Sequence, residues 1–224
     1  VWPDCFITKG LIGLGFKFYC NFYQRTSVKT FDKYIHVAPS FKNWLNRYQV
    51  STNSSFIPLG IDKRFNEIEK NINNSDLNLI YGGTLSYQCD ITKIINAITS
   101  LEVNFLIFGD DGSGSHYQKI KSLSKKNKRI TIFNIVQQNK VVDMYAKSDI
   151  AVIFMISGAL PNKFFDAIGS LTPILAVGNG DVADLVKKYD LGWCIDNNVE
   201  KIKNCLINIS KNAIEQKVIN IKKI

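Results

Sequence analysis

Residues 79–100, LIYGGTLSYQCDITKIINAITS, decide the fold of this chain. A short apolar run, Leu79–Tyr81, is followed by two glycines and then by a helical segment that begins at Asp90. The same succession of apolar run, loop and helical segment recurs along the chain, and the runs are continuous rather than alternating in polarity. It predicts an α/β fold, a doubly wound parallel sheet covered by helices on both faces. The further strands expected are Val103–Phe108, Ile130–Phe133, Ile150–Phe154, Pro173–Val177 and Trp193–Ile195, and the further helices are His116–Lys126, Asn139–Lys147, Asn162–Gly169, Asp181–Tyr189 and Val199–Ile214.

The first 65 residues have a different pattern. A short buried strand is expected at Tyr34–Ala38, a helix capped at Pro39-Ser40 follows it, and a second short strand is expected at Ser55–Pro58. The polar, Asn-rich stretch that then follows, residues 66–77, has the composition of a linker. The chain opens with Val1 rather than Met, and we expect an N-terminal truncation.

The composition excludes several classes of protein. Of the 224 residues, 46% are hydrophobic and 21% are charged, which excludes a disordered or collagen-like chain. The net charge of +9 favours anionic partners such as a phosphorylated ligand, acidic lipid or nucleic acid. The chain is also rich in Lys, Ile and Asn, which is typical of codon usage in an AT-rich genome, so part of this charge need not reflect function. The five cysteines are odd in number and lack C-x-x-C spacing, which favours reduced thiols in the cytosol over disulfides or zinc.

The most apolar N-terminal segment, Gly10–Tyr23, is interrupted by Lys17 and is too short to span a bilayer. No small-residue cleavage site follows it, so it does not have the pattern of a signal peptide. Its aromatic and basic side chains leave two interpretations open. The segment is either a core helix of a truncated domain or an interfacial helix at a membrane surface.

Two loops follow predicted strands and contain glycines. In the first, Gly82-Gly83-Thr84, glycine would let the backbone approach an anion closely, although a plain strand-to-helix turn has the same spacing. The second, residues 109–115, has the pattern G-x-x-G-x-G, which matches neither the dinucleotide fingerprint nor the P-loop. Its two carboxylates would repel phosphate, so we expect a flexible loop there.

The segment 157–169, SGALPNKFFDAIG, is the most informative for function. After a strand and a loop of small residues, Pro161 and Asn162 lead into a short helix, with Asn162 as the expected N-cap. Free backbone N–H groups and the helix dipole favour an anion at this end, and Lys163 adds a positive charge. Asp166 lies one turn further on, within reach of a ribose hydroxyl. The alternative is a capped helix with a surface lysine and aspartate.

The order of these motifs resembles the C-terminal half of a GT-B glycosyltransferase, most of all the family 4 group that builds bacterial surface polysaccharides. Trp2-Pro3-Asp4 and Val37–Ser40 resemble the end of that family's N-terminal domain. The other strings that carry the resemblance are IPLGID at 57–62, YGGTL at 81–85, FGD at 108–110, PNKFFDA at 161–167 and PIL at 173–175, together with Phe65, Phe133 and Tyr145–Asp149.

The resemblance implies a division of the chain into three parts. Residues 1–65 would be the remnant of an acceptor-binding, Rossmann-like domain with its linker, residues 66–214 the C-terminal nucleotide-sugar-binding domain, and residues 215–224 a tail. It also implies a retaining transfer without a metal or other cofactor, from a nucleoside-diphosphate sugar to a glycan or lipid-linked acceptor. Such enzymes work in the cytoplasm, often at the inner face of the cell membrane.

The same resemblance implies the donor-binding residues. They are Gly83 and Thr84 in the first loop, Val136 in the base-contacting loop 134–138, and Pro161, Asn162, Lys163 and Asp166 at the short helix.

The chain departs from the family pattern at several positions. A Glu-x7-Glu pair is typical of the family, and Asp166 would take the place of its second Glu at the ribose. The first Glu falls on Gly158, and no Arg or Lys lies between Thr84 and Asp90. Leu59 stands where Asn is usual. No catalytic residue is therefore assigned, and Lys163 would supply the phosphate-binding charge.

Two other functions remain as alternatives. The missing carboxylate at Gly158 motivates a non-catalytic nucleotide-sugar-binding domain. The net charge alone motivates nucleic-acid binding, but the sequence contains no motif of a nucleic-acid-binding fold. We expect the 224-residue chain to transfer little or no sugar by itself, because a two-domain enzyme needs both of its domains.

Overall fold

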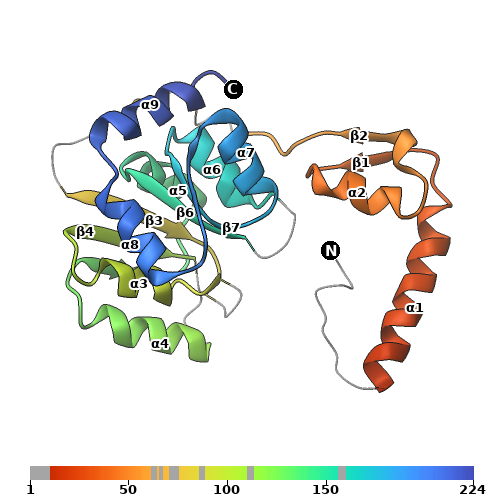
Figure 1. The fold of residues 1–224 in the computed structure, drawn as a ribbon, viewed down its shortest axis with the longest axis horizontal. Coiled ribbons are helices and arrows are strands. Elements are labelled where there is room, and N and C mark those ends of the chain that lie inside the picture. The colour runs from red at the N-terminus through yellow and green to blue at the C-terminus, as the bar shows by residue number, and fades with distance from the viewer. Residues whose placement is uncertain are drawn as a thin grey trace. The chain divides into compact units, whose positions relative to one another are not determined.

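The computed structural model describes residues 11–61, 65, 68–70, 76–85, 89–109, 114–155 and 160–224. The chain divides into two compact units (Figure 1). The first consists of residues 1–59 with 157–160, and the second of residues 60–156 with 161–224.

The first unit contains a small parallel sheet. Strand β1 (Tyr34–His36) pairs with β2 (Ser54–Phe56), and helix α2 (Ser40–Asn46) and the 3-10 turn η1 (Ser51–Asn53) lie between them in sequence. The expected strand at 34–38 is therefore shorter, and it is only partly buried, because Ile35 is 70% exposed whereas His36 is buried. Pro39 occupies the cap position of α2, and no side chain caps that helix.

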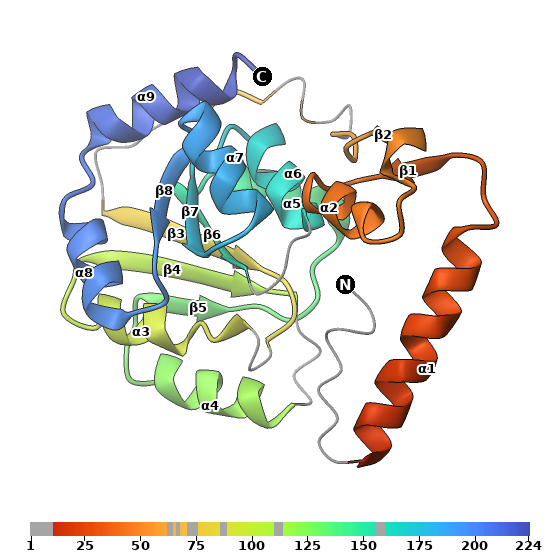
Figure 2. The ribbon, with the colours of Figure 1, turned by 45° about the vertical axis from the view of Figure 1, so that its right-hand side comes forward.

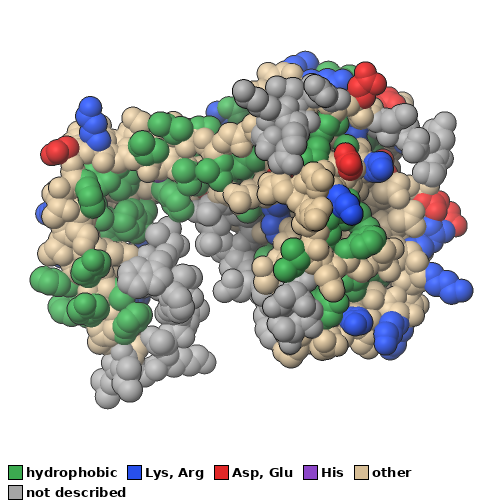
Figure 3. Space-filling model, turned by 180° about the vertical axis from the view of Figure 1, so that it is seen from behind, with side chains coloured by type: hydrophobic (Ala, Val, Ile, Leu, Met, Phe, Trp, Pro, Cys, Tyr) green, Lys and Arg blue, Asp and Glu red, His purple; other side chains and the backbone are tan. Residues whose placement is uncertain are grey.

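Helix α1 (Leu11–Val28) carries large apolar side chains on its surface. Figure 3 shows hydrophobic side chains gathered on the face of the unit that carries this helix. Among the described residues, no helix is both long and apolar enough to cross a bilayer. The exposed apolar side chains of α1 are Leu14, Phe16, Phe18, Tyr19, Phe22 and Tyr23.

The second unit is a six-stranded parallel sheet in the order β5-β4-β3-β6-β7-β8, which confirms the predicted α/β fold. Each strand matches an expected one within two residues. The strands are β3 (Leu77–Gly82), β4 (Val103–Phe108), β5 (Ile130–Ile132), β6 (Ile150–Met155), β7 (Ile174–Gly178) and β8 (Gly192–Ile195). The helices are α3 (Thr92–Ile98), α4 (Ser115–Ser124), α5 (Gln138–Ala146), α6 (Asn162–Gly169), α7 (Asp181–Tyr189), α8 (Val199–Ile207) and α9 (Lys211–Ile221).

The strand order reverses at β3, which pairs with β4 on one side and with β6 on the other. Because the connections between parallel strands are right-handed, α3 and α4 lie on one face of the sheet and α5, α6 and α7 on the other. Helix α8 packs beside α3, and Figure 2 shows α3, α4 and α8 together along one side of the sheet. Their buried side chains and every second residue of the central strands form the main hydrophobic core.

The C-terminal region differs from the expectation of one helix, 199–214, and a tail. Helix α8 ends at Ile207, and α9 starts after Ser210, whose hydroxyl oxygen accepts a hydrogen bond from the Ala213 N–H at 3.2 Å. Residues 215–221, expected in the tail, continue α9 and bury Val218 and Ile221. The serine cap and the renewed apolar spacing explain this second helix.

The stretch expected to be a linker contains a half-buried anchor, Lys70. Its Nζ donates hydrogen bonds to Thr172 Oγ1 at 3.0 Å, to Tyr145 O at 3.4 Å and to Ser148 O. Burial lowers the pKa of Lys70 from 10.5 to about 8, although the Asp149 carboxylate partly opposes this. Lys70 therefore ties this stretch to the end of α5 and to the loop before β7.

Candidate functional site

The carboxyl end of β3 is built from two glycines in close contact with their neighbours. A Cβ at Gly82 would lie 2.5 Å from the Phe108 ring and 2.9 Å from the Tyr145 hydroxyl. Gly83 has φ +140°, and its N–H donates to Phe108 O at 2.9 Å. Only glycine combines this backbone conformation with so little space. The end of β3 therefore presents bare backbone at the edge of the sheet where parallel α/β folds bind ligands.

Lys163, from the first turn of α6, reaches this glycine turn. Its Nζ would lie 2.6 Å from a Cβ at Gly83, and it sits 4.4 Å from the centre of the Tyr81 ring. The Tyr81 hydroxyl donates to Thr84 O at 2.9 Å, so the same ring also holds the exposed Thr84. Burial lowers the pKa of Lys163, and the nearby Cys89 partly opposes this shift. The structure thus brings Gly83, Thr84 and Lys163 together.

Helix α6 begins at Asn162, the residue that was expected to be its N-cap. Pro161, with φ −76° and ψ 155°, is at the cap position, and Asn162 is the exposed first residue of the helix. The prediction that Asn162 caps α6 was wrong. Among the described residues no side chain caps this helix, because proline has no side-chain oxygen to accept from the backbone. The first turn therefore directs its backbone N–H groups and the positive end of the helix dipole outward.

Asp166 lies one turn into α6, beside the buried hydroxyl of Tyr145. Burial raises the pKa of the half-buried Asp166 carboxyl. Burial and the nearby Asp166 charge also raise the pKa of Tyr145, whose hydroxyl faces the Gly82 backbone. The Tyr145 side chain, which is 1% exposed, fills the space between the end of β3 and Asp166. The carboxylate can accept hydrogen bonds at the same edge of the sheet that carries the Lys163 ammonium.

Val136 lies at this edge too, in the loop that follows β5. The loop is joined to the end of β4, because Asn134 O accepts from the Gly109 N–H at 3.3 Å and Asn134 Oδ1 from the Tyr117 hydroxyl at 3.3 Å. Since β4 separates β5 from β3, Val136 belongs to a more distant part of the edge than Gly83 and Lys163.

Some predicted features lie outside the described residues. They include Gly158, where the family pattern has its first carboxylate, and most of the loop 109–115. Sequence reasoning did not identify Tyr81, Tyr145 or Cys89 as part of this site. The tyrosines lie in apolar stretches typical of core positions, so no local pattern distinguishes them as site residues.

Comparisons with known proteins identify the family of this chain. A model of the family described as glycosyl transferases group 1 matches residues 62–223. A search of curated proteins finds no match.

Many solved structures share the fold. Sucrose-phosphate synthase from Thermosynechococcus elongatus is 14% identical, with a TM-score of 0.73 over 89% of this chain and 56% of that one. HepE (Alr3699) from Anabaena, solved in complex with UDP, is 12% identical, with a TM-score of 0.72 over 89% of this chain and 62% of that one. WaaG, a glycosyltransferase involved in lipopolysaccharide biosynthesis, is 16% identical, with a TM-score of 0.67 over 84% of this chain and 57% of that one.

At these identities the structural likeness concerns the fold alone. The chain spans between 56% and 62% of the length of these three proteins. The family match is broader evidence, because it covers most of the chain, including the glycine turn, the loop after β5 and the whole of α6. The chain belongs to the glycosyl transferases group 1 family, within the GT-B superfamily of glycosyltransferases.

Proposed function

We propose that the edge formed by β3 and α6 binds the diphosphate of a nucleoside-diphosphate sugar. The observation that carries this proposal is the Lys163 ammonium held against the Gly83 turn. The uncapped start of α6 points its dipole toward the same place, and both features favour a doubly charged anion. Asp166 would accept hydrogen bonds from the ribose, and the backbone of the loop at Val136 would contact the base.

The reaction that follows is transfer of the sugar to an acceptor hydroxyl. The acceptor oxygen forms a bond to the anomeric carbon and passes its proton to the departing diphosphate, while the bond from that carbon to the diphosphate oxygen breaks. The electron pair leaves with the diphosphate, so negative charge develops beside Lys163 and the start of α6. Charges and dipoles fixed in advance at that place stabilise the transition state.

The finer features of the reaction rest on the family resemblance. We propose that transfer is retaining, needs no metal, and delivers the sugar to a glycan or lipid-linked acceptor at the cytoplasmic side of a membrane. Lys163 would supply the positive charge that a metal gives to the diphosphate in other transferases. A role in the synthesis of a bacterial surface polysaccharide rests on the same family resemblance.

Titration calorimetry with UDP, GDP, ADP and dTDP tests the donor site. We expect one diphosphate to bind, with an affinity unchanged by EDTA. Lys163→Met and Asp166→Asn should each weaken binding about tenfold, since each removes a charge-assisted contact. Lys119→Met, an exposed lysine of α4, is the matched control and should bind as the wild type does. Binding that is equally strong in all three variants would disprove the proposed site.

A non-catalytic nucleotide-sugar-binding domain is the second candidate. The observation that favours it is Gly158 at the position where the family pattern has a carboxylate. Under this alternative the variants weaken nucleotide binding in the same way, but no sugar is transferred. Mass spectrometry of acceptor glycans, after incubation with the donor and the longest natural form of the protein, separates the two candidates.

A further inference from the structure

A groove of about 950 Å3 lies on the face of β4 and β5 that no helix covers fully. Along β4, Val103, Phe105 and Ile107 are buried against α3 and α4, whereas Asn104 and Leu106 on the other face are only half-buried. The topology explains this opening. Helix α5 leaves the edge strand β5 and must cross to β6, on the far side of β3, so it forms one wall of the groove and leaves the floor open.

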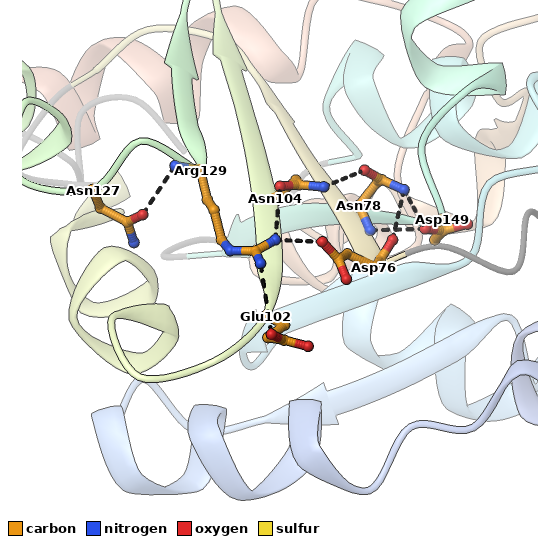
Figure 4. A network of polar contacts seen from close by, with 7 residues as sticks. All are labelled: Asp76, Asn78, Glu102, Asn104, Asn127, Arg129 and Asp149. Atoms are coloured by element: carbon orange, nitrogen blue, oxygen red, sulfur yellow. Dashed lines mark hydrogen bonds and ion pairs between the residues drawn. The ribbon is translucent and has the colours of Figure 1, made fainter.

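Polar side chains held in fixed positions lie beside Leu106 in the floor of the groove. Asn78 of β3 is paired in register with Asn104 of β4, and the Asn104 Nδ2 donates to Asn78 Oδ1 at 3.1 Å. Asn78 Nδ2 donates in turn to Asp149 Oδ2 at 3.0 Å (Figure 4). The next cross-strand pair joins Leu106 to the exposed Thr131 of β5. A row of carboxamide and hydroxyl groups in fixed positions suits a ligand rich in hydroxyl groups.

The rim of the groove is cationic. Lys128, Lys140 and Lys147 line it and are exposed, and among the described residues none of them forms an ion pair with a carboxylate. Within the part of the chain that the structure describes, Asp143 is the one acidic side chain that lines it. Arg129 also lines it, but its guanidinium is already paired with Asp76 and lies 3.8 Å from Glu102 (Figure 4). The groove therefore favours a ligand with negative charges that the lysines can reach.

The end of the groove near the carboxyl end of β5 is apolar. Phe133 and Ile135, in the loop after β5, are 47% and 73% exposed, and Met144 of α5 lies on the opposite wall. An exposed aromatic ring beside polar groups provides a flat surface for the C–H face of a sugar ring. Amide and hydroxyl donors, an aromatic surface and positive charge thus meet in one groove.

We propose that this groove is a second carbohydrate site, which binds an acidic oligosaccharide. It adjoins the donor site at the loop 134–137, which includes Val136, and extends from there along the face of the sheet toward the amino ends of the strands. An amphipathic peptide helix would need a continuous apolar floor, and here two asparagines and a threonine interrupt the apolar side chains. Lysine and arginine both contact the phosphates of a nucleic acid, so tetrauridylate serves as a competing ligand in the test. The proposal does not depend on sugar transfer.

NMR titration of the 15N-labelled full chain with a hyaluronan tetrasaccharide tests the proposal. We expect resonance shifts at Asn104, Thr131 and Phe133, and weaker binding at high salt. The double variant Lys140→Glu/Lys147→Glu should raise the Kd about tenfold or more. Thr131→Trp, which fills the floor, should abolish binding. The matched control Lys119→Glu/Lys126→Glu reverses two exposed lysines with the same spacing at α4, on the covered face, and should leave the Kd unchanged.

Four outcomes would overturn the proposal. They are no binding, equal binding of neutral maltotetraose, tighter binding of tetraglutamate or tetrauridylate in the same groove, and equal weakening by the control variant. Thermal unfolding of each variant shows whether it is folded. If Thr131→Trp fails to fold, the exposed lysine pair still decides the outcome, because its side chains take no part in the core.

Discussion

At the scale of single residues, the two glycines of β3 have separate tasks. Gly82 leaves room for the Phe108 ring and the Tyr145 hydroxyl, which pack against the strand where a Cβ would lie. Gly83 adopts a backbone conformation that other residues avoid, and it leaves space for Lys163. The first glycine therefore serves packing, and the second serves the candidate site.

Replacing Gly82 by alanine should lower the free energy of unfolding by about 1–3 kcal/mol, since the new methyl group overlaps a fully packed ring. Urea denaturation of the purified chain measures this. Gly60→Ala is the control, because a Cβ there meets nothing within 4 Å, and its effect should stay under about 0.5 kcal/mol. Equal stability of the two variants would contradict the described packing.

Several site residues could be predicted from the sequence because local chemistry marks them. Gly83 ends an apolar run, and Lys163 and Asp166 are charges within an apolar helix. Tyr81 and Tyr145 could not, since a tyrosine in an apolar stretch has the same pattern whether it packs in the core or faces a ligand site. Their roles depend on contacts between β3, α5 and α6, which are far apart in sequence.

Lys70 makes stability depend on pH. Its pKa is lowered from 10.5 to about 8 in the folded chain, so between these values the unfolded chain binds a proton that the folded chain has released. The free energy of unfolding should therefore rise with pH across this window, by at most roughly 3 kcal/mol from this group. The substitution Lys70→Met removes this titrating group. Urea denaturation at pH 7.5 and 10 should show a smaller rise for the variant, and parallel changes would refute the assignment.

At the scale of elements, apolar runs predicted the strands well, because each central strand is buried along most of its length. The same runs predicted helices on both faces, which is confirmed, but they did not predict the groove that α5 leaves beside β4 and β5. Their polar alternate residues, Asn104 and Thr131, were the available signal. Which face stays open depends on where α5 crosses, and that follows from the strand order rather than from any local pattern.

The boundary between α8 and α9 depends on the Ser210 cap. Ser210→Ala should cost about 1 kcal/mol, because the Ala213 N–H loses its partner at the start of α9. Ser124→Ala, at the end of α4, removes a hydroxyl that only donates to Lys121 O and should cost less. Chemical denaturation followed by circular dichroism compares the two, and an equal loss would show that the cap contributes nothing specific.

At the scale of the whole molecule, the apolar surface of α1 predicts self-association. Contiguous exposed apolar side chains favour burial against a partner. Phe18→Ser/Phe22→Ser should therefore shift the chain toward the monomer in sedimentation velocity at increasing concentration. The control Ile207→Ser/Ile219→Ser removes two exposed apolar side chains from α8 and α9 and should not change the distribution. A wild-type chain that is monomeric at every concentration would contradict this prediction.

The strand order has a consequence for synthesis on the ribosome. Strand β3 is the centre of the sheet, but its second neighbour, β6, is far along the chain, with Leu79 opposite Ile150. At ordinary elongation rates, the nascent β3 keeps one unpaired edge for about 4–14 s after it emerges. During that interval the incomplete sheet β3-β4-β5 exposes unpaired backbone N–H and C=O groups, with which other nascent chains can pair. Slower translation would prolong this exposure, and a chaperone that covers the edge would raise the yield of folded protein.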